Sequence, residues 1–206
     1  MLYALSGSHR CGKSTLAKGL AESCGLTYVP IKTTEVALKH GYNPVAPMTL
    51  ETRIGLQVIL LDEYMSTIAG CPRPAIVDRS PLDHLAYLLA EIHMQSHNEV
   101  PHLMIEKLMK LIEATTSTLS HHIDMVIYLH PLPTYEVDPT KPAPNRLYQY
   151  HYASVLRGMI AVEGHKFNWA DVPMADHAQR LEFCSSMIGQ RIAQIEHLKA
   201  HSPHLH

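Results

Sequence analysis

Short, nearly continuous hydrophobic runs alternate along the chain with longer segments in which hydrophobic residues recur every three or four positions. Runs of the first kind are typical of buried parallel strands, and segments of the second kind are typical of helices with one buried face. We predict strands at 2–6, 26–30, 74–78, 124–130 and 165–169. We predict helices at 13–24, 49–69, 80–95, 101–119, 146–162 and 175–199.

This alternation predicts an α/β fold, because parallel neighbouring strands need a long crossover between them and a helix usually supplies it. The expected architecture is a three-layer sandwich with a mostly five-stranded parallel sheet and helices on both faces. A chain of 206 residues is long enough for one domain with its own core. We therefore expect a single domain over 1–206.

Two segments lack hydrophobic periodicity. In the segment 32–47, a glycine at 41 and prolines at 44 and 47 predict a loop with one helical turn at most. The segment 131–145, "PLPTYEVDPTKPAPN", holds five prolines and predicts a long loop. We interpret 131–146 as a lid.

Composition limits the class of protein. Hydrophobic residues make up 46% and charged residues 17%, which is typical of a globular domain, and the formal net charge of −2 argues against a general attraction to nucleic acid. Four cysteines without a Cys-x-x-Cys pair favour reduced thiols. Since no hydrophobic run approaches 18 residues, we expect a cytoplasmic protein without a membrane span.

The stretch "GSHRCGKST" at 7–15 has the spacing of a phosphate-binding loop and lies between a predicted strand and a predicted helix. Gly7 and Gly12 allow successive backbone N–H groups to converge on an anion, and the helix offers its positive end to it. Lys13 would reach the β- and γ-phosphates, and the Ser14 hydroxyl would coordinate Mg²⁺, so the expected cofactors are ATP and Mg²⁺. The nucleotide-binding residues predicted by this motif are Gly7, Ser8, His9, Cys11, Gly12, Lys13, Ser14 and Thr15.

A second group of charged residues follows the strand 74–78. Because ligands of parallel sheets bind beyond the carboxyl ends of the strands, Asp78 can face the metal or the acceptor hydroxyl. Arg79 can clamp a phosphate with two parallel hydrogen bonds. A surface pair at a strand end is the alternative for both. The predicted metal ligands are therefore Ser14 and Asp78.

Other candidates for acceptor binding lie in the region 31–55. Arg53 is placed to grip an acceptor phosphate, although a solvated helix charge fits the same position equally well. Thr33, Thr34 and Tyr42 are further candidates for the acceptor pocket, alongside Arg79. Arg146 at the end of the lid is a candidate for stabilising the transferred phosphoryl group, and Lys141 is a weaker one.

Three tyrosines at 148, 150 and 152 alternate by two on a predicted helix. Positions two apart do not share a helix face, so we interpret these tyrosines as packing at the boundary of the core and not as a platform for stacking bases.

The segments "IVDRSPLDHLAY" (76–87) and "IDMVIYLHPLP" (123–133) resemble motifs of P-loop nucleotide kinases. The first resembles the Asp-Arg-Ser/Tyr motif of thymidylate kinases and related deoxynucleoside and nucleoside monophosphate kinases, and several phage deoxynucleotide-kinase-like proteins share its plan. The second resembles the strand before their lid. Thymidylate kinases of one type carry an acidic residue and then an arginine in the loop, where this chain has His9 and Arg10. Their "Arg-Glu-Pro-Gly-Gly" stretch after the second strand is absent here.

The resemblance spans about residues 1–170 and implies the chemistry of a kinase, with the acceptor left open. It implies that Arg10 reaches the phosphoryl group during transfer and that the protein is a homodimer. The catalytic residues expected are Lys13, Arg10, Asp78, Arg79 and Arg146.

The leading hypothesis is transfer of the γ-phosphoryl group of ATP to a nucleoside monophosphate, most simply a deoxynucleotide. A modified base hydroxyl in DNA, of the hydroxymethyluracil type, and an unphosphorylated nucleoside are alternative acceptors; the net charge argues against duplex DNA. A regulatory ATPase or GTPase switch is the alternative of another class. A proline-rich lid favours a kinase, because closure excludes water from the reaction.

Overall fold

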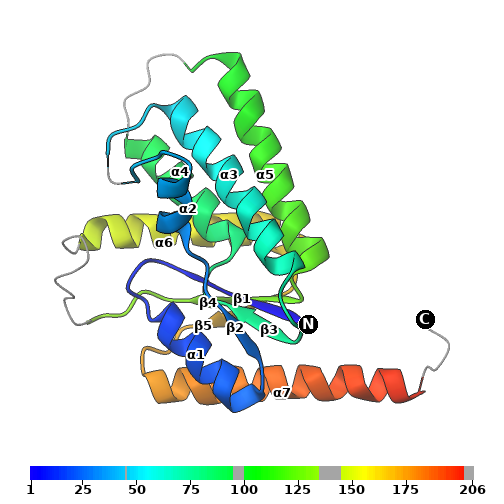
Figure 1. Ribbon diagram of the computed structural model, residues 1–206. Helices are drawn as coiled ribbons and strands as arrows, with labels where there is room; N and C mark the ends of the chain where they lie inside the picture. The colour runs from blue at the N-terminus through cyan, green and yellow to red at the C-terminus, as the bar shows by residue number, and fades with distance from the viewer. Residues whose placement is uncertain (45, 95–99, 135–144, 202–206) are drawn as a thin grey trace.

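The computed structural model describes residues 1–44, 46–94, 100–134 and 145–201, with a five-stranded sheet at its centre (Figure 1). The strands lie in the order β2-β3-β1-β4-β5, and the four pairings are parallel. Their bounds are β1 (Leu2–Gly7), β2 (Thr27–Val29), β3 (Ala75–Val77), β4 (Met125–Leu129) and β5 (Trp169–Val172). The predicted α/β sandwich with a parallel sheet is confirmed.

Helices cover both faces of the sheet (Figure 1). Side chains of β1 alternate between the faces: Leu2 and Ala4 pack against one helical layer, and Tyr3 and Leu5 against the other. The first layer contains α3 (Leu50–Ala69), α4 (Pro81–Met94), α5 (His102–His122) and α6 (Arg146–Glu163), and the second contains α1 (Lys13–Cys24) and α7 (His177–His201).

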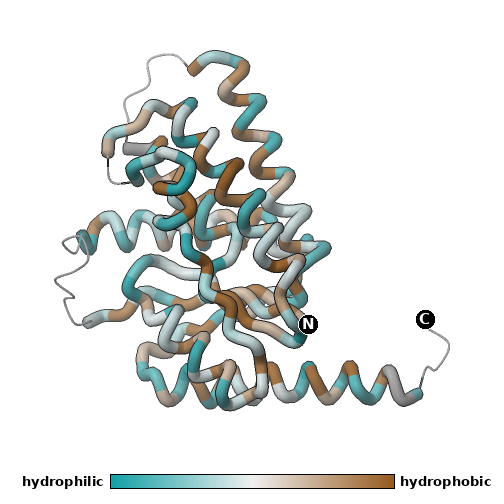
Figure 2. The backbone as a smooth tube through the Cα atoms, viewed as in Figure 1, coloured by the Kyte–Doolittle hydropathy of each residue, from teal (hydrophilic) through white to brown (hydrophobic). Residues whose placement is uncertain are grey.

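Hydrophobic and hydrophilic positions alternate along α3 and α5, as expected for helices with one buried face (Figure 2). A separate cluster of buried side chains, Ile54, Leu85, Leu88, Met104 and Leu111, joins α3, α4 and α5. These three helices therefore pack together on the same face of the sheet as α6. Each helix in the described ranges is too short or too polar to cross a membrane.

The loop after β1 lies at a topological switch point of the sheet, where the strands that follow β1 are added on opposite sides of it. From β1 the sheet extends through β3 to one edge and through β4 to the other. The loop at 7–12 leaves the carboxyl end of β1, and Asp78 follows β3 directly. Ligands of such sheets bind at this switch point, so both motifs meet at the same edge.

Three predictions about elements need correction. The segment 32–47 contains a seven-residue helix, α2 (Thr33–Lys39), because no glycine or proline lies inside it and Gly41, with φ 80°, comes only after its end. The strand predicted at 165–169 begins only at Trp169, since Gly164–Lys166 form a 3₁₀ turn that continues α6. The last helix continues to His201.

The predicted lid at 131–146 falls mostly on residues 135–144, which lie outside the described residues, as does Lys141. At its end, Arg146 opens α6, is exposed and donates a hydrogen bond to the Pro133 carbonyl. Arg146 thus joins the two ends of the predicted lid.

Candidate active site

The loop after β1 depends on glycine where the backbone turns most sharply. Gly7 has φ 153°, and a Cβ there would lie 2.6 Å from the Leu129 carbonyl oxygen of β4, so no larger residue fits. Gly12, with φ 87°, precedes the first turn of α1. Arg10, with φ 59°, is a left-handed residue that is not glycine. The backbone therefore has the concave conformation of anion-binding loops, in which successive N–H groups can point at one anion.

The Lys13 ammonium lies inside the loop. Its Nζ donates to the carbonyl oxygens of Gly7, at 2.5 Å, and Ser8, at 2.8 Å, and only 8% of the residue is exposed. The Nζ also lies 4.0 Å from Oδ1 of Asp83. The positive charge is thus placed where the motif predicts a phosphate chain.

Two of the predicted loop residues point their side chains inward. Cys11 is fully buried in the core beneath the loop, and the Ser8 hydroxyl is buried with no hydrogen-bond partner among the described residues. These residues can contribute to an anion site through their backbone. Ser14 and Thr15, in contrast, are exposed on the first turn of α1.

The structure brings Ser14 and Asp78 together. The Ser14 hydroxyl donates to Asp78 Oδ2 at 2.7 Å, and the Tyr28 hydroxyl donates to the same oxygen at 2.8 Å. The Ile31 N–H donates to Oδ1 at 3.0 Å. Burial and the bond to Asp78 raise the pKa of Tyr28 to about 12. Tyr28 is a site residue that the sequence analysis missed; it orients Asp78 from β2.

Cationic side chains gather around His9. Burial, and then the nearby charges of Lys13, Arg10 and Arg79, lower the pKa of His9, so that its ring is neutral near pH 7. The ring stacks on Tyr148 of α6, with 6.0 Å between ring centroids. Arg79 is half-buried, and none of the described residues accepts a hydrogen bond from it. The site thus carries an excess of positive charge beside a neutral His9.

Asp83, in the first turn of α4, is the second residue that the sequence analysis missed. It is fully buried and accepts hydrogen bonds from the Gly7 N–H, at 2.9 Å, the Ser80 N–H, at 2.9 Å, and the Tyr152 hydroxyl, at 2.8 Å. One carboxylate therefore joins the loop, the start of α4 and the middle of α6.

A family model described as an AAA domain matches residues 2–180, which is most of the chain. The chain belongs to this AAA domain family. No curated protein matches its sequence.

The fold of this AAA domain is also that of several solved structures. A deoxyadenosine kinase from M. mycoides with bound dCTP is 16% identical over 92% of this chain and 100% of that chain, with a TM-score of 0.65. A thymidylate kinase from Candida albicans is 14% identical over 92% of this chain and 91% of that chain, with a TM-score of 0.64. NadR protein in complex with NAD and AMP-PNP is 14% identical over 90% of this chain and 49% of that chain, with a TM-score of 0.57. The predicted likeness to P-loop nucleotide kinases is confirmed for the fold.

The predicted acceptor-binding residues of the AAA domain lie in different places. Arg53 forms an ion pair with Glu91 of α4, and its Nε is buried with no partner among the described residues. Thr33 and Thr34 open α2, shortly after the Ile31 N–H that binds Asp78. Their roles, like those of the predicted catalytic residues, stay predictions.

Tyr42 lines a groove of about 780 Å³ between α3 and α5, and no residue of the phosphate loop contributes to that lining. There it packs with residues of α2 and α3. The predicted role of Tyr42 in the acceptor pocket stays a prediction.

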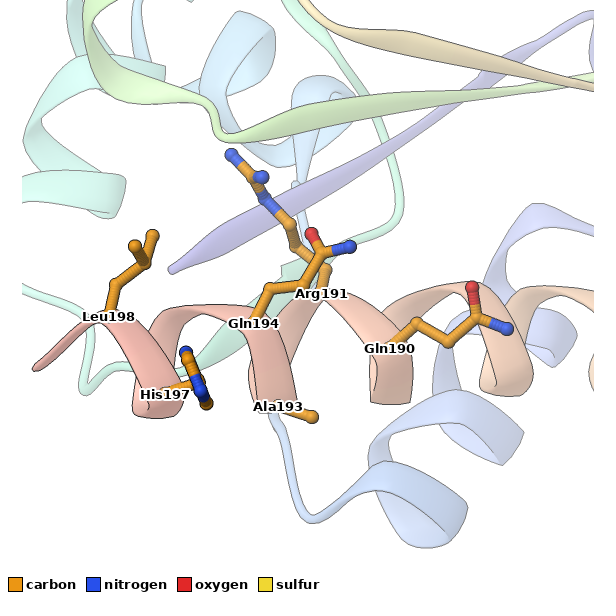
Figure 3. Close-up of a pocket in the computed structure, with 6 residues that line it drawn as sticks. All are labelled: Gln190, Arg191, Ala193, Gln194, His197 and Leu198. Atoms are coloured by element: carbon orange, nitrogen blue, oxygen red, sulfur yellow. The ribbon is translucent and has the colours of Figure 1, made fainter. Parts of the chain in front are cut away.

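A second hollow, of about 580 Å³, lies along the exposed part of α7 (Figure 3). Arg191 extends from it toward the strands (Figure 3). Gln190, the first residue that lines this hollow, lies ten positions after Arg180, which is the α7 residue that contacts the loop. Ten residues correspond to about 15 Å along a helix. The hollow is therefore separate from the loop site. Its lining is Gln190, Arg191, Ala193, Gln194, His197 and Leu198.

The prediction that Tyr148, Tyr150 and Tyr152 do not share a helix face needs a correction. Tyr148 and Tyr152 are four residues apart and share a face of α6, where both lie against Tyr87 of α4, with ring centroids 6.3 and 4.5 Å away. Tyr150 is the exposed one. The boundary packing that we predicted holds for Tyr148, and Tyr152 is fully buried.

We expect acid to destabilise the AAA domain through His84 of α4. Burial, and then the charge of Arg79, lower the pKa of His84 from 6.5 to about 4. The unfolded chain takes up this proton near pH 6.5, whereas the folded chain does so only near pH 4. The neutral His84 therefore contributes fully to the free energy of unfolding above pH 6.5, and about 3 kcal/mol of that free energy is lost as the pH falls to 4.

Urea unfolding at several pH values measures this loss. A His84→Gln variant should lack that part of the pH dependence, and the exposed His177→Gln should keep it. Equal pH dependence of the wild type and His84→Gln would contradict the assignment.

Proposed function

We propose that this AAA domain transfers the γ-phosphoryl group of Mg²⁺-bound ATP to a nucleoside monophosphate, most simply a deoxynucleotide. The proposal is supported by the loop geometry around Lys13 and by a fold that deoxyadenosine and thymidylate kinases share. In such a reaction the protein contributes mainly positioning and positive charge around the transferred group.

The donor half of the site would be the loop and the start of α1. Lys13 would exchange its contacts with the loop carbonyls for the β- and γ-phosphates. Ser14 and Asp78 offer the hard oxygen ligands that Mg²⁺ prefers, and this metal commonly keeps several waters and substrate phosphates as its other ligands. Bound Mg²⁺ would supply neutralisation of charge on the phosphate chain.

One observation favours a phosphate acceptor over a hydroxyl. Lys13, Arg10 and Arg79 all bring positive charge to His9. The nearby carboxylates already accept hydrogen bonds, three in the case of Asp78 and four in the case of Asp83. A nucleoside hydroxyl needs a general base, whereas the phosphate of a monophosphate is already anionic and needs cations. Arg79 would bind this phosphate, and Arg10 would contact the group in transfer.

A panel of acceptors tests the proposal directly. Purified protein with Mg²⁺ and ATP is given deoxynucleoside monophosphates, nucleosides, or DNA that contains hydroxymethyluracil, and the products are separated. We expect a nucleoside diphosphate only with a monophosphate acceptor. Labelled nucleoside or DNA would identify another acceptor, and ATP hydrolysis of equal rate without any acceptor would favour a regulatory switch.

Replacing Arg79 by alanine should raise the KM for the acceptor about 10- to 100-fold and leave the KM for ATP within a few-fold, because a charge-assisted bond to the acceptor phosphate is lost. Steady-state kinetics with each substrate varied in turn measures both constants. Arg157→Ala, which removes an exposed arginine from α6, is the matched control. A rise confined to the KM for ATP would place Arg79 on the donor side.

A further inference from the structure

Two buried side chains hold the phosphate loop from outside. Gln149 of α6 donates from Nε2 to the His9 carbonyl at 2.8 Å, and Arg180 of α7 donates from Nη1 to the Cys11 carbonyl at 2.6 Å. Gln149 is 0% exposed and Arg180 is 2% exposed. Neither residue belongs to the motif, and both come from helices late in the chain.

The two carbonyls belong to alternate peptide units of the loop. The His9 carbonyl shares its peptide with the Arg10 N–H, and the Cys11 carbonyl shares its peptide with the Gly12 N–H. In a trans peptide the C=O and N–H groups point in opposite directions, so bonds on the outside turn the two N–H groups away from the helices. Arg10 and Gly12 both have a positive φ, and alternating backbone conformations of this kind make anion-binding concavities.

We propose that Gln149 and Arg180 are positioning residues for the triphosphate. By binding the His9 and Cys11 carbonyls, they fix the orientation of the two peptide units and polarise them, so that the Arg10 and Gly12 N–H groups become better donors to phosphate oxygens. They act through the backbone and need no contact with the nucleotide. The inference rests on the proposed function, since it takes the loop to bind a phosphate chain.

The remaining contacts link both ends of the predicted lid to the loop. Besides Cys11, Arg180 donates to the carbonyls of Met174, at 2.6 Å, and His130, at 2.9 Å. His130 directly precedes the segment 131–146, and Gln149 lies three positions after its end, in the first turn of α6. Gln149 and Arg180 therefore connect described residues on both sides of the segment 131–146 to the peptide units of the loop.

The chemistry of the two side chains is unusual for purely structural groups. The Gln149 Oε1 is buried with no partner among the described residues, so this oxygen loses its hydration without gaining a hydrogen bond. Arg180 is held by carbonyls alone, with no described carboxylate at ion-pair distance, and burial lowers its pKa. Its positive charge therefore adds to the potential at the loop.

Gln149→Met gives a test that separates positioning from folding. Methionine has nearly the same shape and removes both the bond to His9 and the unpaired oxygen, so the melting temperature should stay close to that of the wild type or rise. We expect the Kd for Mg²⁺-ATP, measured by isothermal titration calorimetry, to rise about ten-fold. Gln190→Met, on the exposed part of α7, is the matched control and should keep the wild-type Kd.

Two further measurements complete the test. Arg180→Lys leaves a single amine that cannot span three carbonyls, so it should weaken ATP binding more than Gln149→Met does. The Arg10 amide proton should move downfield when ATP is added to the wild type and less in Gln149→Met. Wild-type Kd and amide shifts in Gln149→Met would overturn the inference. No ATP binding by the wild type would instead overturn the proposed function.

Discussion

Lys13→Ala should reduce phosphoryl transfer by at least about 10²- to 10³-fold, the largest effect on activity that we expect of any single change. The Nζ lies inside the loop on the carbonyls of Gly7 and Ser8, where the phosphate chain would bind. Its loss removes the charge nearest the transferred group. Product formation under saturating ATP and acceptor measures the effect.

Folding should survive this change, because Asp83 keeps its bonds to Gly7, Ser80 and Tyr152 without the lysine. Circular dichroism and the melting temperature check the fold. Lys166→Ala, which removes an exposed lysine just after α6, should retain full activity. A Lys13→Ala protein with near wild-type turnover would remove the basis for a donor site in the loop.

Asp83→Asn should lower the free energy of unfolding by about 3 kcal/mol, the largest loss of stability that we expect from removing a single charge. The carboxylate accepts from the Gly7 and Ser80 N–H groups and from Tyr152, and both of its oxygens are used. An amide would turn an NH₂ group toward one of these donors, which leaves a buried donor unsatisfied beside the loop. Urea unfolding at pH 7 measures the loss.

The exposed Asp62→Asn on α3 is the control for the chemistry of the substitution and should change stability little. Tyr152→Phe should cost less than Asp83→Asn, because it removes one donor and leaves the carboxylate its backbone partners. If Asp83→Asn unfolds at the same urea concentration as the wild type, Asp83 does not support the loop.

The parts of the site that sequence predicts are those that depend on local spacing. The pattern around Gly7, Gly12 and Lys13 requires a strand before it and a helix after it, and both lie within a few residues. Asp78 was found for a similar reason, since the end of a buried strand is visible in the sequence. The fold class followed from the same alternation of hydrophobic runs and periodic segments.

The parts that were missed depend on contacts between distant segments. Tyr28 is recognised only once β2 and β3 are known to be neighbours, and Gln149 and Arg180 only once α6 and α7 are placed beside the loop. Asp83 did have a local signal: it is an acidic residue three positions after the Ser80 that precedes a helix, the spacing of a capping box. That spacing predicts a cap but not a contact with Gly7.

The long sequence separation of the contacts that shape the loop has a consequence for folding. Cys11 and Arg180 are 169 residues apart, and His9 and Gln149 are 140 residues apart. Contacts of this kind form slowly, because the chain between them must be ordered first. Under the proposed function, ATP binding should therefore require the complete fold, and ATP should protect the protein against global unfolding more than against local opening.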